Sequence, residues 1–211
     1  MGVWDTVGAL GVPGHFTAAP LFNRHFMFHD TDLSEMVRAA RHAVSVDERR
    51  KSFRPTLWTN LDALNDAREG RPYRQAWFAG DHGSVGGGGE ITALSSIALR
   101  WVLEGAAAAG LEFDEILLEA IARECDPTGP LFNADPPRGG PVAALMRQFG
   151  AARAPVTRLE DVHAAVRTRW VHEGDGDGFR PYRPEPLQGL AREFEAWRES
   201  RIRAPRATPS A

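Results

Sequence analysis

Cysteine and long apolar runs are both scarce in this chain of 211 residues. The single cysteine, Cys125, cannot form an internal disulfide, and its neighbours have helical character, so we expect a structural thiol in a reducing compartment, the cytoplasm. No stretch approaches the roughly 20 apolar residues that span a bilayer, and the amino terminus lacks the basic and apolar run of a secretory signal. We therefore expect neither a transmembrane segment nor a cleaved leader.

A strong excess of one charge is also lacking. The formal net charge is -3, and the basic residues are scattered among acidic ones. Such a balance gives no general attraction to nucleic acid, so we expect no nucleic-acid partner. Hydrophobic residues make up 43% of the chain, which is enough for the core of one globular domain.

Several motifs that carry chemistry are missing. The chain has no Gly-x-Ser-x-Gly, and its glycine run at residues 83–89 lacks the Gly-Lys-Ser/Thr ending of a phosphate loop. His25 and His29 are four positions apart but lack the glutamate of a zinc helix. The alternating Asp and Gly of residues 174–178 lack the further ligands of a calcium loop. We therefore expect no metal and no cofactor.

Apolar patterns divide the chain into strands and helices. Residues 1–5 and 75–79 are predicted as buried strands, because each holds strand-forming apolar residues followed by a glycine-containing loop. Asp32 and Glu35 resemble a capping box before apolar residues at helical spacing. Helices are predicted at residues 32–45, 91–110, 114–124, 141–149, 159–172 and 187–201, with a loop or short strands at 16–29, a charged turn at 47–56, a flexible turn at 174–178 and a disordered tail at 203–211.

Asp5 and His82 each follow a predicted strand and precede a loop. A buried carboxylate that accepts from one imidazole nitrogen holds a general-base histidine in one tautomer, so the two could form an acid–base pair. Two other interpretations remain open: Asp5 could cap the following turn, and the glycines after His82 could be a flexible connection to the next helix.

Several segments together are similar to a bacterial α/β-hydrolase family whose best-known members are type VI secretion phospholipase effectors. They are GVWDTVG at residues 2–8, DERRKSFRPTLW at 47–58, VGGG at 85–88 and the helix at 94–103 with ALRW. Weaker similarity lies at VH in residues 162–163 and YRP in 182–184. The similarity therefore extends over most of residues 1 to about 190.

The resemblance implies a serine esterase or phospholipase in which Asp5 is the triad acid and His82 the general base. The family's serine stands in a Gly-x-Ser-x-Gly turn that would precede Met1 here. The family often has His-Ser-Asp-Val where this chain has HGSV at residues 82–85. Ser84 is a poor substitute nucleophile because it is only two positions from His82. Ser45, Ser52, Ser95 and Ser96 lack a sharp glycine turn.

The sequence thus predicts an α/β protein with few parallel strands and predominant helices. Residues 1–202 would be the carboxyl-terminal portion of an α/β-hydrolase domain. It would supply the triad acid and histidine, act on an ester or phospholipid, and be inactive alone, with export by a type VI system as an option. A partner chain could supply the missing half. Two alternatives stay open: a non-catalytic remnant or regulatory module that docks to another polypeptide, and a gene whose true start lies upstream.

Overall fold

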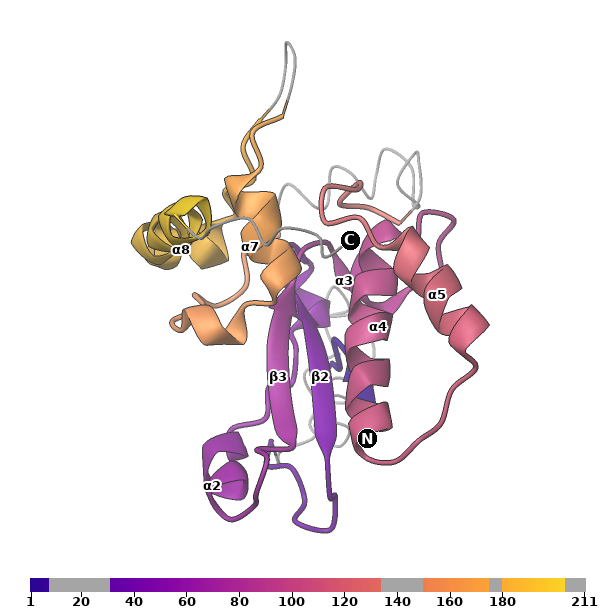
Figure 1. Cartoon of the computed structure of the whole chain (residues 1–211). Coiled ribbons are helices and arrows are strands. Elements are labelled where there is room, and N and C mark those ends of the chain that lie inside the picture. The colour runs from indigo at the N-terminus through magenta and orange to yellow at the C-terminus, as the bar shows by residue number, and fades with distance from the viewer. Residues whose placement is uncertain (8–30, 134–149, 175–179, 204–211) are drawn as a thin grey trace, which may run out of the picture.

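Three parallel strands form the centre of the protein, which is described here from a computed structural model over residues 1–7, 31–133, 150–174 and 180–203 (Figure 1). Their order in the sheet is β1-β2-β3. The strands are β1 (Gly2–Trp4), β2 (Ala40–Ser45) and β3 (Tyr73–Phe78). The register pairs Trp4 with Ala43 and Ser45 with Phe78, so all three strands end at the same edge of the sheet.

The central strand, β2, corrects the predicted helix at residues 32–45. Five of its six residues are buried, because β1 and β3 flank it and helices cover it. Arg41 and His42 hide the strand pattern in the sequence: Arg41 extends along the Trp101 ring, and His42 is fully buried with its own hydrogen-bond partners. The chain before β2 forms turns, and Met36, one of the apolar residues at the predicted helical spacing, is 92% exposed.

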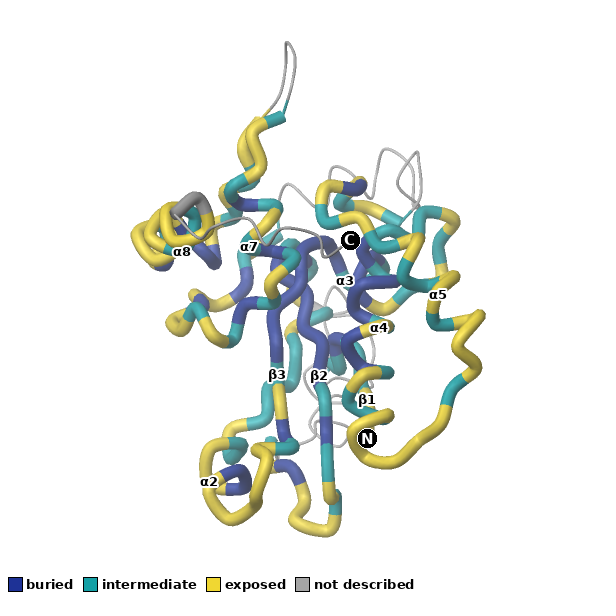
Figure 2. The backbone as a smooth tube through the Cα atoms, viewed as in Figure 1, coloured by how far each residue is buried: buried dark blue, intermediate teal, exposed yellow. Residues whose placement is uncertain are grey.

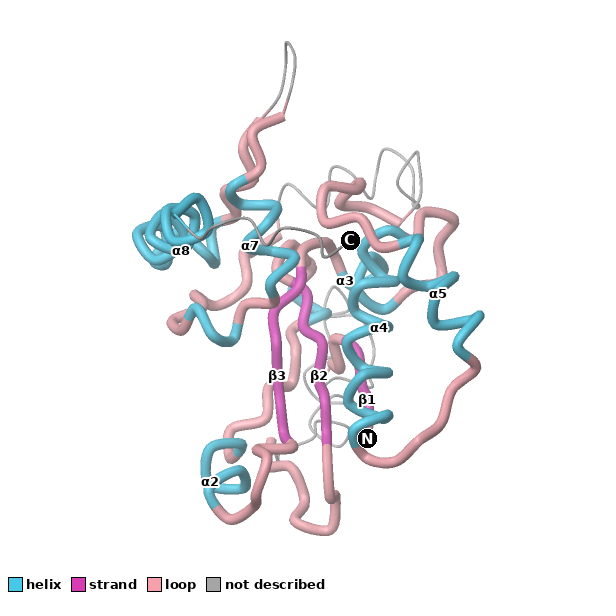
Figure 3. Tube along the Cα trace, in the orientation of Figure 1, coloured by secondary structure: helices cyan, strands magenta, loops and turns pink. Residues whose placement is uncertain are grey.

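Two long helices follow the sheet as the sequence predicts (Figure 3). α4 (Ala93–Ala108) packs on β1 and β2, and α5 (Glu115–Glu124) packs on α4. The Asp114 carboxylate accepts from the backbone N–H groups of Ile116 and Leu117, which confirms the predicted cap of α5.

Shorter elements complete the described chain. The predicted helix at 159–172 is helical only over its second part, after a 3-10 turn, and the predicted helix at 187–201 is a 3-10 turn followed by a helix that continues to Arg203. These elements are α2 (Leu61–Asp66), α3 (His82–Gly86), α7 (Ala164–Val171), α8 (Ala191–Arg203), and the 3-10 turns η1 (Lys51–Phe53), η2 (Leu159–Asp161) and η3 (Glu185–Leu190).

The core lies between the sheet and the helices (Figure 2). Val44 and Phe78 from the strands join Ala98 of α4 in one buried cluster that also includes Trp170 and Phe194. Strand β1 approaches α4 so closely that a Cβ at position 2 would lie 2.3 Å from Val102 Cγ1, which requires glycine there.

The predicted α/β class, with few parallel strands and mostly helices, is confirmed. The predictions for residues 16–29, 141–149 and 175–178, and for the tail after Arg203, lie outside the described residues. Among the described helices, none has the length and apolar character needed to cross a bilayer.

Candidate active site

Asp5 lies at the carboxyl end of β1 with its side chain completely buried. Its backbone N–H still donates to Ala43 O, at 2.7 Å, as if the strand continued. Its φ of +39°, however, lies in the left-handed region, which a non-glycine residue adopts at a cost of about 1–3 kcal/mol. This turn directs the carboxylate from the strand end toward the ends of β2 and β3.

His82 stands four residues after the end of β3 and is the first residue of α3, where the sequence predicted a glycine-containing loop. Gly80, with φ of +104°, turns the chain, and a Cβ there would lie 2.5 Å from Ser84 Cβ. The Asp81 carboxylate then caps α3 by accepting from the backbone N–H of Ser84 at 2.9 Å. The His82 side chain stays 32% exposed, so its ring can meet a ligand.

The structure brings Asp5 and His82 together, although they are 77 positions apart in the sequence. The distance from His82 Nδ1 to Asp5 Oδ2 is 2.8 Å. Because an ionised carboxylate only accepts, Nδ1 carries the proton of this bond and Nε2 is left as the basic nitrogen of the neutral ring. This arrangement is the one expected of a carboxylate that orients a general base.

Arg153, in the described segment that begins at residue 150, is the second donor to the same carboxylate oxygen. Its Nη2 lies 2.8 Å from Asp5 Oδ2, while Asp5 Oδ1 accepts from the backbone N–H of Ser45 at 2.9 Å. Burial alone would raise the pKa of Asp5, but the His82 hydrogen bond, the Arg153 charge and the Ser45 N–H together lower it. Asp5 is therefore a carboxylate at neutral pH.

The loop after β2 forms the wall beside the imidazole. The Phe53 ring meets the His82 ring edge-on at 4.8 Å between centroids, and the Arg50 guanidinium stacks on Phe53. The buried Glu48 carboxylate accepts from Arg50 and, at 3.3 Å, from the backbone N–H of His82. The predicted charged turn thus holds both the ring and the backbone of His82.

The serines near this pair are directed elsewhere. The Ser84 hydroxyl is buried and donates to Leu131 O at 2.8 Å and to Asp81 Oδ1 at 3.0 Å, which agrees with its rejection as a nucleophile. Ser45 ends β2 rather than lying in a helix, and its buried hydroxyl accepts from Arg153. Ser95 lies in α4 and donates to Thr92 O. The side chain of Ser52 is outside the described part.

His42 supports the turn at Asp5 from the neighbouring strand. Its Nε2 accepts from the backbone N–H of Thr6 at 3.2 Å, and its Nδ1 donates to Gln75 Oε1 at 3.0 Å. Burial lowers the pKa of His42, so the ring stays neutral at pH 7. It is a structural link between β1 and β3.

The half-buried Asp47 connects the carboxyl-terminal segment to the same end of the sheet. Asp47 Oδ2 accepts from Gly80 N–H at 2.7 Å and from the Tyr182 hydroxyl at 2.8 Å. Burial raises the pKa of Asp47 to about 6, against the effect of these hydrogen bonds and of Arg169. The chain around residue 182 therefore braces the loop that leads to His82.

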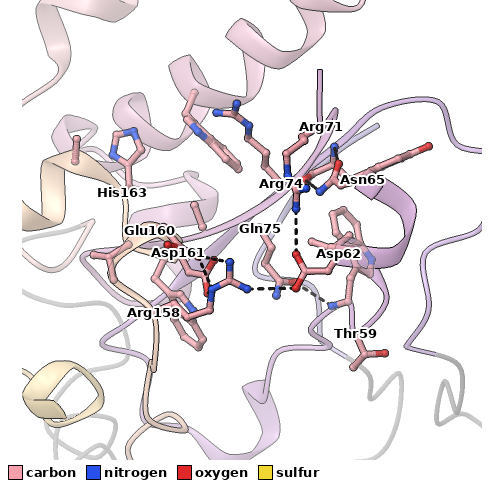
Figure 4. Close-up of a pocket in the computed structure, with 18 of the residues that line it drawn as sticks. Thr59, Asp62, Asn65, Arg71, Arg74, Gln75, Arg158, Glu160, Asp161 and His163 are labelled. Carbon is pink, nitrogen blue, oxygen red and sulfur yellow. Dashed lines mark hydrogen bonds and ion pairs between the residues drawn. The ribbon is translucent and has the colours of Figure 1, made fainter. Parts of the chain in front are cut away.

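A cleft of about 580 Å³ lies along β3 and does not include the Asp5 and His82 side chains (Figure 4). Arg71 and Arg158 both pair with Asp62, at 3.3 and 3.2 Å. These side chains are at least half exposed, so each pair contributes little stability. His163 also lines the cleft, but burial lowers its pKa to about 4 and its Nδ1 accepts from Ala165 N–H. The imidazole is a helix cap there rather than a base.

No group of three or more His, Cys, Asp or Glu side chains suited to hold a metal occurs among the residues that the structure describes. His25, His29 and most of the acidic loop at 174–178 lie outside those residues.

The comparison with protein families bears on the amino-terminal half. Residues 1–105 match the type VI secretion system (T6SS) phospholipase effector Tle1-like catalytic domain. The Tle1-like match includes Asp5, His82, all three strands and most of α4, and over this range it agrees with the predicted resemblance. The weaker similarities at residues 162–163 and 182–184 fall outside the match. No curated protein and no solved structure matches the chain.

Arg153 and Glu48 are the site residues that sequence reasoning missed. Glu48 lies in the segment that carries the resemblance, but only as part of a charged turn. Arg153 stands among alanines beyond the Tle1-like match, and no local pattern marks it. Both become visible only when residues far apart in the chain meet around Asp5 and His82.

Proposed function

We propose that this chain supplies the acid and the general base of a serine esterase, with Asp5 orienting His82. The single observation that carries the proposal is the 2.8 Å contact between His82 Nδ1 and Asp5 Oδ2. The contact lies at the carboxyl edge of a parallel sheet, where α/β-hydrolases hold these two members of the triad. The Tle1-like match supports an ester bond in a phospholipid as the substrate and export by a type VI system.

In the proposed reaction, His82 Nε2 removes the proton from a serine hydroxyl as its oxygen attacks the ester carbonyl carbon. The imidazolium then protonates the leaving alcohol, and an acyl-enzyme remains. Water is deprotonated by the same nitrogen and hydrolyses the acyl-enzyme, which regenerates the serine. The Asp5 carboxylate stabilises the imidazolium in both steps, and its full ionisation at neutral pH suits that role.

The serine itself is proposed to come from outside residues 1–211. None of the chain's eight serines stands in a Gly-x-Ser-x-Gly turn, and the Ser84 and Ser45 hydroxyls are committed to other partners. The nucleophile and its oxyanion hole would come from polypeptide encoded before Met1 or from a partner chain. Residues 1–211 would then be the carboxyl-terminal portion of the catalytic domain and inactive alone.

One observation favours a second candidate, a non-catalytic module that docks to another polypeptide. Strand β1 is the outer strand of the described sheet, with Gly2 exposed and Val3 and Trp4 only half-buried. An outer parallel strand of this kind offers backbone groups to a further strand. The docked strands would then serve binding rather than hydrolysis.

The test is to read the DNA upstream of the Met1 codon and to express the longest in-frame polypeptide that ends with residues 1–211. If it contains Gly-x-Ser-x-Gly, we expect it to release fatty acid from phosphatidylglycerol or phosphatidylethanolamine vesicles. His82→Ala is expected to lower the rate by about 10⁴-fold or more, because the serine loses its base. His172→Ala, at an exposed histidine after α7, is the matched control and should keep full activity.

Equal hydrolysis by the parent, Asp5→Ala and His82→Ala proteins would refute the triad assignment. An upstream stop codon, together with a stable complex between residues 1–211 and another chain that shows no hydrolysis, would favour the docking module.

A further inference from the structure

Backbone hydrogen bonds hold the segment that carries Arg153 on both sides of the arginine. Ala151 N–H donates to Arg49 O at 3.0 Å, and Val156 N–H donates to Pro186 O at 2.9 Å. The Val156 side chain is itself 5% exposed and belongs to the main core cluster. The backbone on both sides of Arg153 is therefore held in place, and the arginine enters the site from a fixed position.

The Arg153 guanidinium is bound on two of its nitrogens. Nη2 donates to Asp5 Oδ2 at 2.8 Å and to Ser45 Oγ at 2.9 Å, while Nη1 donates to the backbone oxygen of Phe53. The side chain is 4% exposed. A planar guanidinium has its donors in fixed directions, so this set of contacts fixes where Asp5 Oδ2 lies.

Asp5 Oδ2 therefore faces two donors, the guanidinium and His82 Nδ1. Arg153 keeps its charge at all physiological pH values, so its bond to Oδ2 does not depend on pH in that range.

Other charged groups lie near the contacts of Arg153, Asp5 and His82. They are Glu48, Arg50 and Asp47 from the loop after β2, and Asp81 at the start of α3. Glu48 and Arg50 neutralise each other through a bidentate pair. Asp47 bonds Gly80 and Tyr182 rather than the ring, and Asp81 is committed to the cap of α3.

We propose that Arg153 is a positioning residue of the Asp5 and His82 pair: its guanidinium fixes the carboxylate against His82 Nδ1. A carboxylate held in this way keeps the proton on Nδ1 and leaves Nε2 as the basic nitrogen of the neutral ring. This inference rests on the proposed function for its catalytic meaning. The contacts among Arg153, Asp5 and His82 are a property of the folded chain itself and can be tested without a nucleophile.

The test is the exchange rate of the His82 Nδ1 proton with water, measured by NMR in residues 1–211 with the resonance assigned by its loss in His82→Gln. Arg153→Gln is expected to raise the rate several-fold, because the shared carboxylate oxygen loses the group that fixes it. Arg153→Lys is expected to raise it less, since one ammonium retains the charge but cannot reproduce the bonds to Asp5, Ser45 and Phe53. Arg167→Gln is the matched control, since Arg167 donates to the backbone oxygens of Leu159 and Val162 and should leave the rate unchanged.

An unchanged exchange rate in a folded Arg153→Gln protein would overturn the proposal. If that protein does not fold, as judged by circular dichroism, Arg153→Lys decides. Exchange faster than in the parent is expected for Arg153→Lys, and exchange as slow as in the parent would overturn the positioning role. Neither result depends on ester hydrolysis, so failure of this inference and failure of the proposed function are separate outcomes.

Discussion

Purified protein of residues 1–211 is expected to hydrolyse a short-chain ester no faster than buffer does. Loss of the serine from a triad costs about 10⁶ in rate, and loss of an oxyanion-hole donor costs roughly a further 10² to 10³. The pair of Asp5 and His82 can orient and transfer a proton, but a proton relay without a nucleophile forms no acyl-enzyme. The expected rate is therefore at least about 10⁶-fold below that of a nucleophile-containing polypeptide.

The measurement is p-nitrophenyl butyrate hydrolysis at several protein concentrations, with His82→Ala as the variant and His172→Ala as its control. Slow turnover equal in all three proteins would be a contaminant or a nonspecific surface effect. Turnover that scales with the protein and disappears only in His82→Ala would contradict the expected inactivity. It would mean that a nucleophile exists within the 211 residues.

The second large effect concerns stability. Asp5→Ala is expected to lower the free energy of unfolding by about 3–5 kcal/mol, because it leaves the buried Arg153 guanidinium without its carboxylate. The backbone N–H of Ser45 also loses its acceptor, Asp5 Oδ1. A domain of ordinary stability has about 5–15 kcal/mol in total, so this one change can bring the protein close to unfolding.

Urea denaturation followed by tryptophan fluorescence measures this loss. Asp5→Ala combined with Arg153→Met should cost less than the sum of the single variants, because the unpaired charge is gone. Asp114→Ala is the control: it removes a carboxylate from the exposed cap of α5 and should cost about 1 kcal/mol. A loss below about 1 kcal/mol for Asp5→Ala would show that the buried pair seen at 2.8 Å does not hold Asp5 in solution.

The parts of the fold that follow from local pattern could be predicted from sequence. Strand β3 is an apolar run that ends at glycine, α4 repeats apolar residues at helical spacing, and α5 begins at an aspartate cap. Strand β1 was predicted from Val3 and Trp4. Each of these signals lies within a few residues of the element that it predicts.

Strand β2 could not be predicted in this way. Its Arg41 and His42 are polar for reasons outside the strand: one side chain lies along Trp101, and the other bonds Thr6 and Gln75. The apolar residues on either side then imitate helical spacing. An argument from residue pattern alone therefore predicts a helix here. The contacts that make this segment a strand come from α4, β1 and β3.

The candidate site, too, could be predicted from sequence only where a local pattern marks its residues. Asp5 and His82 could be proposed because each follows a strand and lies in a segment that resembles a known family. Arg153 could not, because its partners lie 148 and 108 positions away, at Asp5 and Ser45. Only the fold brings two hydrogen-bond donors, the imidazole and the guanidinium, to one carboxylate oxygen.

The central claim is that Asp5 holds the His82 imidazole with its proton on Nδ1 and its basic nitrogen on Nε2. The most direct measurement is the ¹⁵N chemical shift of both ring nitrogens of His82 at a pH where the ring is neutral, in the parent protein and in Asp5→Asn. We expect the Nδ1-protonated tautomer in the parent and a shift toward the Nε2-protonated tautomer in Asp5→Asn, whose amide can donate to Nδ1. An Nε2-protonated ring in the parent, unchanged by the substitution, would contradict the account.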